Sequence, residues 1–322
     1  MKKLWNVVAL LAVLAMATGC SLTGGTEPAK PAEDVIKEAM TNLSKVTSGN
    51  YELAMKGDVV GAEGQVPANA SFDGTIGGLF DSKDPKKPQF TMKLDGTMSI
   101  DKAESQDVEV ELRLNQTDVY VNLAKLPDLG ESVPKEMVAA FTGKWWQIAI
   151  PAGAFEGLPV TGGDEATMTP EQKALKTLIE NTKFFKDLKF EGNESVGGSD
   201  CLHYVGSLDK VAIKTFVTEA AKLQGQVMSE TELKDLDSLL GATEAPADLW
   251  VDSSNMTMKK IGTKLTIAPE GAGSLTLDFS FMVSDVNKAV TVEVPAGATI
   301  FDPAMLFGGA MPTGATTEVP AL

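Results

Sequence analysis

The sequence has few of the side chains that perform catalysis or bind metals. Its 322 residues include two cysteines, Cys20 and Cys201, and one histidine, His203. A single histidine excludes a multi-histidine zinc site, and the sequence contains no GxSxG, HExxH or glycine-rich phosphate-binding motif. A calcium loop of alternating aspartates is also missing. These absences argue against an enzyme and predict neither a cofactor nor a metal ion.

Cys201 and His203 lie two residues apart and therefore share one face of a predicted strand. Such a pair would suit a Cys/His dyad or part of a metal site. No third group that would orient the histidine is identifiable in the sequence. We therefore favour the interpretation that both are ordinary residues of a sheet.

The first twenty residues have the features of an export signal. Two lysines precede an apolar run over residues 4–17, and three small residues then lead to Cys20. The run is too short for a typical membrane-spanning helix, and no later segment has ~18 consecutive apolar residues. The pattern resembles the signal peptide and lipobox of bacterial lipoproteins. An ordinary secretory peptide, or an N-terminal anchor that stays in place, is the alternative.

The resemblance to lipoproteins implies that residues 1–19 are removed and that the lipid on Cys20 attaches the protein to a membrane. The protein is then extracytoplasmic and lipid-anchored to the cell membrane, and Ser21 is compatible with the outer membrane if the organism has one. With Cys20 lipidated, Cys201 has no partner for an intramolecular disulfide. The stability of the exported domain must then come from its core.

Acidic residues outnumber basic ones by 44 to 28, which gives a formal net charge of −16. This charge argues against nucleic acid as a partner and against a protein lying flat on anionic lipid. A hydrophobic content of 43% indicates a globular protein. Small, glycine- and proline-rich residues predict a flexible tether at 20–32 and a disordered tail at 304–322. The predicted folded domain is 33–303.

Hydrophobic periodicity in the first half of this domain predicts one helix followed by a meander. Residues 34–48 have helical spacing, and Gly49 is expected to end the helix in a left-handed conformation. Apolar and polar residues then alternate through hairpin-connected strands up to residue 123. A short helix at 134–141, a strand at 144–150 and a helix from Pro170 to about Phe185 complete this half.

The second half begins with a hairpin across Gly197 and Gly198. We expect a helix capped by Asp209, with Val211 facing inward, and a second helix at 230–240. Four strands are then predicted, at 247–252, 256–267, 274–283 and 290–294. Together the elements predict an α+β fold in which a curved antiparallel sheet carries helices on its concave face.

This order of elements resembles the LolA/LolB-like lipoprotein-carrier superfamily, and within it the LppX/LprG type. The segments Leu249-Trp250-Val251-Asp252 and 292–296 (VEVPA) carry the resemblance most clearly. It covers about residues 33–303, by order of elements more than by motifs. It implies a half-open β-barrel with helices as a lid over an apolar cavity, a lipid or acylated ligand in that cavity, and no enzymatic activity.

Methionine and phenylalanine are frequent, with 14 and 13 residues. Methionine is flexible and suits an adaptable apolar cavity, although filling of an irregular core is the alternative. Trp145 and Trp146 must point to opposite faces of their strand. The candidates for lining a ligand cavity are Met55, Met92, Met98, Trp146, Leu277, Phe279 and Phe281.

The sequence leaves a second function open. The protein could be a structural or protein-interaction lipoprotein of the envelope that has no small ligand. Its sheet would then be filled by its own side chains, and its contacts would lie on loops such as 125–141 or 151–168.

Overall fold

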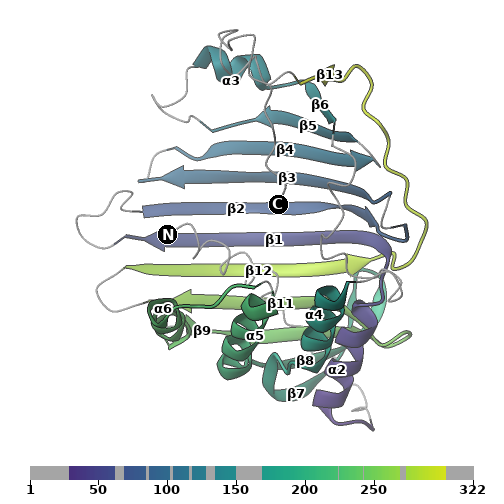
Figure 1. Cartoon of the computed structure of the whole chain (residues 1–322), viewed down its shortest axis with the longest axis vertical. Helices are drawn as coiled ribbons and strands as arrows, with labels where there is room; N and C mark the ends of the chain where they lie inside the picture. Colours follow the sequence, from purple (N-terminus) through teal and green to yellow (C-terminus); the bar gives the residue numbers. More distant parts are fainter. Residues whose placement is uncertain are drawn as a thin grey trace.

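The structure is a computed structural model of the whole chain (Figure 1). It describes residues 29–61, 69–84, 87–101, 104–115, 118–127, 135–149, 169–223, 225–241, 243–268 and 273–301. The predicted signal peptide, Cys20, most of the tether, the loop 151–168 and the tail 304–322 lie outside these ranges. Within them, no helix has the length and apolar character needed to cross a membrane.

The strands of the described residues form one sheet. In chain order they are β1 (Ser48–Val60), β2 (Asn69–Asp81), β3 (Gln89–Ile100), β4 (Gln106–Asn115), β5 (Asp118–Lys125), β6 (Trp145–Ala149), β7 (Phe185–Val196), β8 (Ser199–Leu208), β9 (Thr243–Glu244), β10 (Pro246–Asp252), β11 (Thr257–Ile267), β12 (Ser274–Ser284) and β13 (Thr299–Ile300). Their spatial order is β13-β6-β5-β4-β3-β2-β1-β12-β11-β10-β8-β7, with β9 beside β11. Neighbours are antiparallel except β13 and β6, and β12 returns from late in the chain to pair with β1.

The described helices are α2 (Ala32–Leu43), α3 (Lys135–Phe141), α4 (Pro170–Asn181), α5 (Lys210–Leu223) and α6 (Glu230–Gly241). Figure 1 shows α2, α4, α5 and α6 in front of the half of the sheet that runs from β12 to β7, and α3 at the opposite edge near β6. The sheet is open, because its outer strands β13 and β7 do not pair in the described structure. The predicted fold class, a curved, half-open antiparallel sheet with helices on its concave face, is confirmed.

Local chemistry explains several of the boundaries. The Asp209 carboxylate accepts hydrogen bonds from the backbone N–H groups of Val211 and Ala212, at 2.9 and 3.1 Å, and caps α5 as predicted. Ser229 and Glu232 form a reciprocal capping box at the start of α6. Gly197 and Gly198, with φ of 55° and 78°, make the tight turn between β7 and β8.

Four sequence predictions were wrong in detail. Gly49 does not end a helix, because α2 stops at Leu43 and Gly49 pairs with Phe80 inside the sheet. Phe185 begins β7, since α4 ends at Asn181. Val211 is 75% exposed, because Ile213 and Phe216 occupy the inward side of α5. Residues 290–294 form no strand; they belong to an irregular segment that crosses the ends of other strands.

Candidate functional site

Side-chain alternation gives the sheet one apolar face. Paired residues of neighbouring strands point to the same side, and Leu53 of β1 pairs with Ile76 of β2 and with Phe281 of β12. The same row continues through Leu94 and Val110. We call this side, which carries Leu53, the apolar face.

The helices cover the apolar face over β12, β11, β10 and β8. Helix residues such as Val35 and Phe216 form one core cluster with sheet residues such as Leu249, Met258 and Phe279, and each of these is at most 4% exposed. Burial of this kind contributes roughly 25 cal/mol per Å² of apolar surface. This half of the molecule is a packed core.

The other half of the apolar face has no described helix over β2–β4 (Figure 1). Its apolar side chains stay partly exposed, in contrast to the core cluster. We call the following set the uncovered apolar face: Phe72, Ile76 and Phe80 of β2, Phe90, Met92, Leu94 and Met98 of β3, Val108, Val110 and Leu112 of β4, and Val119, Val121 and Leu123 of β5.

Two glycines lie in the middle of the uncovered apolar face. Gly74 and Gly96 pair across β2 and β3, and a Cβ on Gly96 would lie 2.7 Å from the Asp73 carbonyl oxygen. The two backbones therefore approach too closely for side chains. The result is a stripe without side chains, flanked on β3 by Leu94 and Met98.

Aromatic rings mark one end of this face. Tyr51 reaches across Gly78, stacks on Phe90 at 5.5 Å between ring centroids, and donates a hydrogen bond of 2.8 Å to the Thr91 carbonyl. Burial raises the pKa of the Tyr51 hydroxyl well above its ordinary value, so it stays protonated. These contacts hold the Tyr51 side chain in place, and it presents a neutral, largely apolar surface at this end of the face.

Trp146 lies on β6 at another border of this face, beside Val121 of β5. Its ring lies 5.1 Å from Phe141 of α3 and 6.0 Å from Phe301, and its indole N–H donates to the Phe141 carbonyl at 3.0 Å. Trp145 points to the opposite side, as predicted, where the Arg113 guanidinium lies 4.8 Å from its ring. The two neighbouring tryptophans therefore have separate environments.

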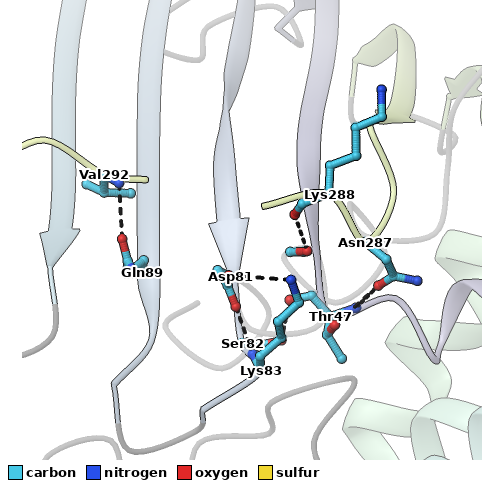
Figure 2. A network of polar contacts seen from close by, with 9 residues as sticks. Thr47, Asp81, Ser82, Lys83, Gln89, Asn287, Lys288 and Val292 are labelled. Carbon is cyan, nitrogen blue, oxygen red and sulfur yellow. Dashed lines mark hydrogen bonds and ion pairs between the residues drawn. The ribbon is translucent and has the colours of Figure 1, made fainter. Parts of the chain in front are cut away.

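An irregular segment at 285–298, which we call the strap, runs along the strand ends at the same side of the molecule (yellow in Figure 1). Figure 2 shows how it is held: Asn287 bonds to Thr47, and Val292 N–H donates to Gln89 Oε1 at 3.0 Å. The Ser48 hydroxyl donates a further hydrogen bond to the Lys288 carbonyl at 2.7 Å.

Side-chain amides and a guanidinium fasten the strap further along. Asn115 Nδ2 donates to the Val292 carbonyl, and Arg113 Nη1 donates to the Glu293 carbonyl, each at 3.1 Å. Val292 is 4% exposed, whereas Ile100, at the other end of the apolar face, is 45% exposed. One end of the face is thus bordered by the strap, and the other end reaches solvent.

All seven predicted cavity residues lie on the apolar face, in two environments. Phe279 belongs to the core cluster, and Met55, Leu277 and Phe281 pack against it. Met92 and Met98 belong to the uncovered apolar face, and Trp146 borders this face on β6, beside Val121.

The opposite face of the sheet is polar. Its ion pairs include Lys56 with Asp73 at 3.4 Å and Lys93 with Glu109 at 3.1 Å. Pairs of this kind are exposed, so each adds little to stability. They show which side of the sheet faces water.

His203 and Cys201 lie on the polar face with separate partners. His203 stacks on Trp250 at 4.6 Å, and its Nε2 lies 3.0 Å from Asp248 Oδ1. The Cys201 thiol donates to the Ser199 carbonyl, and burial raises its pKa to about 11, opposite to an activated nucleophile. Among the described residues, no group of three or more His, Cys, Asp or Glu side chains could hold a metal ion.

Comparison with known proteins gives a limited set of similarities. No family model matches the chain. An uncharacterized 31.2 kDa protein in the rplA-rplJ intergenic region of Streptomyces griseus is 29% identical over 150 residues, which are 46% of this chain and 44% of that protein. The match therefore spans less than half the length of this relative.

Several solved structures are similar at low identity. LprF from Mycobacterium bovis is 12% identical with a TM-score of 0.36, over 84% of this chain and 100% of that chain. LppX from Mycobacterium tuberculosis is 15% identical with a TM-score of 0.29, over 81% and 97%. A LolA superfamily protein from Nitrosomonas europaea is 12% identical with a TM-score of 0.18, over 80% and 96%. At these values the similarities carry no conclusion about the family, the ligand or the role of this chain.

Proposed function

We propose that this chain is a membrane-anchored extracytoplasmic lipoprotein that binds the acyl chain of a lipid, or of another acylated molecule, on the uncovered apolar face. The observation that carries the proposal is the partly exposed apolar surface over β2–β5, beside a core cluster that is buried. Monomeric soluble proteins rarely expose contiguous apolar patches beyond a few hundred Å² unless the patch binds something.

The composition of this surface suits a flexible hydrocarbon chain. The Gly74–Gly96 stripe offers a shallow seat without side chains, and Met92 and Met98 nearby can change rotamer to follow a chain of variable shape. A ligand would enter from the open end near Ile100 and stop at the aromatic end beside the strap. Its binding free energy would scale with the apolar area removed from water, at roughly 25 cal/mol per Å² as an upper value.

The N-terminal features supply the location. Lipidated Cys20 would hold the protein on the cell membrane, or on the outer membrane of an organism that has one. The tether at 20–32 would let the folded domain 33–303 stand off an anionic surface, which suits the net charge of −16 of the whole chain. The membrane would then be both the anchor and the source of ligand.

Mass spectrometry of the protein purified from a bacterial envelope, before and after organic extraction, tests the proposal. We expect a stoichiometric lipid that extraction removes, and renewed binding of a fluorescent fatty acid by the extracted protein. Ile76→Gln, on the uncovered apolar face, should weaken probe binding at least tenfold. Thr75→Gln, next to it on the polar face, should leave binding unchanged.

Two results would overturn this proposal. One is a protein that carries no lipid and, once extracted, binds no acyl probe, which would favour an interaction lipoprotein without a small ligand. The other is probe binding that both variants weaken equally, since the ligand would then lie away from the uncovered apolar face.

A further inference from the structure

A second site candidate lies on other strands, at the strap end of the sheet. Three turns border a pocket of about 310 Å³: the turn between β7 and β8, the turn between β10 and β11, and the start of the strap after β12. Its polar and charged lining includes Ser199, Asp252, Thr257, Lys259, Asp285 and Lys288.

Lys259 occupies an unusual position in this pocket. Trp250 of β10 pairs with Lys260, but its neighbour Val251 pairs with Met258, so Lys259 is the extra residue of a β-bulge. Lys259 is only 7% exposed. A Cβ placed on Gly197 would lie 3.6 Å from Lys259 Nζ, so the ammonium lies against the glycine turn.

The carboxylates of the pocket are already bonded to other groups. Asp252 accepts from the backbone N–H and the hydroxyl of Ser254, at 2.9 and 2.5 Å. Asp285 pairs with Lys288 at 2.6 Å and accepts from Asn50 at 3.1 Å. In the described part of the chain, Lys259 Nζ has neither a hydrogen bond nor an ion pair, although its charge lies within electrostatic reach of both carboxylates.

The ionisation of Asp252 follows from these contacts. Burial acts to raise its pKa, but hydrogen bonds from Ser254 and Ser199, together with the charge of Lys259, hold the pKa below its ordinary value. The carboxylate therefore stays charged and is bonded to Ser254 and Ser199, while the ammonium of Lys259, a residue that is only 7% exposed, has no hydrogen bond or ion pair with the described residues.

We propose that this pocket binds a phosphate group, either free or in the headgroup of a phospholipid, with Lys259 Nζ as its principal donor. Phosphate oxygens can accept from the ammonium and from the neighbouring hydroxyl of Thr257 at the same time. Lys288 can turn from Asp285 to the ligand at little cost in free energy, because the ion pair between them is exposed. The Lys288 side chain is 71% exposed and the Asp285 side chain 48%. The site does not depend on acyl binding by the uncovered apolar face.

Titration of the full chain with inorganic phosphate, followed by the backbone amide NMR signals of Gly197, Gly198 and Ser199, tests this site. Saturable shifts of these signals, absent with equal ionic strength of sodium chloride, are expected. Phosphate should also raise Tm by mass action. No shift of these amides in the wild-type protein at saturating phosphate would overturn the proposal.

Variants identify the donor. Lys259→Met should weaken phosphate binding at least tenfold and abolish the rise in Tm, whereas Lys264→Met, at an exposed lysine of the same strand, should change neither. If Lys259→Met does not fold, Lys259→Arg keeps the charge and should keep binding. Phosphate binding that survives in Lys259→Met would contradict the assigned donor.

Vesicles distinguish the two sources of the phosphate. The vesicles contain a short-chain phosphatidic acid, and the response is the shift of the same amide signals in wild-type protein. If this lipid causes the shift at concentrations at least tenfold lower than inorganic phosphate does, the site binds a lipid headgroup. Equal responses indicate free phosphate. A response to vesicles that is retained in Lys259→Met would contradict the site, because it would come from another surface.

Discussion

Gly74 of β2 and Gly96 of β3 lie directly opposite each other on the apolar face, and neither position has room for a Cβ. The added atom would lie 2.8 Å from the Asp95 carbonyl oxygen at Gly74, and 2.7 Å from that of Asp73 at Gly96. Both obstacles are backbone atoms, which no rotamer change can move. The pair therefore fixes the close approach of the two strands in the centre of the proposed ligand seat.

Gly96→Ala should lower the free energy of unfolding by about 1–3 kcal/mol, because the strands must move apart. Urea denaturation measures the change. Gly77→Ala is the matched control on β2, since a Cβ there would meet only the Tyr51 carbonyl at an ordinary 3.5 Å. Equal effects of the two variants would show that the Gly74–Gly96 contact is not tight in solution.

The two halves of the apolar face should differ in stability. Leu249→Ala, in the packed core at 0% exposure, should cost about 2–5 kcal/mol. Leu94→Ala, on the uncovered apolar face, should cost clearly less in ligand-free protein, because its side chain already contacts water. Chemical denaturation of both variants after lipid extraction checks this. Similar losses of unfolding free energy in the two variants would mean that other parts of the protein cover the uncovered apolar face and keep it from water.

Cys201 should make stability fall at high pH. Burial raises the pKa of its thiol to about 11 in the folded state from an ordinary value of 9.0, so the unfolded chain loses this proton first. The contribution to stability is complete below about pH 9 and declines until about pH 11. Urea denaturation between pH 8 and 11 should show a steeper decline for wild type than for Cys201→Ala. Parallel curves would contradict a buried thiol.

The strap should become more mobile when the side chains that accept its backbone hydrogen bonds are removed. Gln89→Ala removes the bond from Val292 N–H, a loss of about 1 kcal/mol. Hydrogen exchange of the Val292 amide should then accelerate about fivefold, while the amide of Leu249 in the core stays unchanged. Thr97→Ala, at an exposed site on the same strand, is the control. Unchanged exchange at Val292 in Gln89→Ala would show that this bond does not hold the strap.

Alternation in the sequence was sufficient to predict the faces of the sheet. Residues two apart must share a side, so Met92 and Met98 could be assigned to one apolar face without knowledge of the fold. The same rule separated Trp145 from Trp146. It also predicted an antiparallel sheet, because each strand has one apolar and one polar side.

Alternation could not predict which distant strands pair. The contact between β1 and β12 joins residues more than two hundred positions apart, and it determines which half of the face the helices cover. Residues 290–294 alternate like a strand, yet side chains of Gln89 and Asn115 hold them across the strand ends. The position of Lys259 depends on a bulge, which no local pattern marks.

The most direct test of the proposed function is photo-crosslinking with a fatty acid that carries a diazirine on its acyl chain, followed by peptide mapping. We predict that crosslinks concentrate on β2, β3 and β4, around Ile76, Leu94 and Val110, and that excess unlabelled fatty acid removes them. Crosslinks confined to the polar face or to the outer surfaces of α5 and α6, or none above background, would contradict acyl binding on the uncovered apolar face.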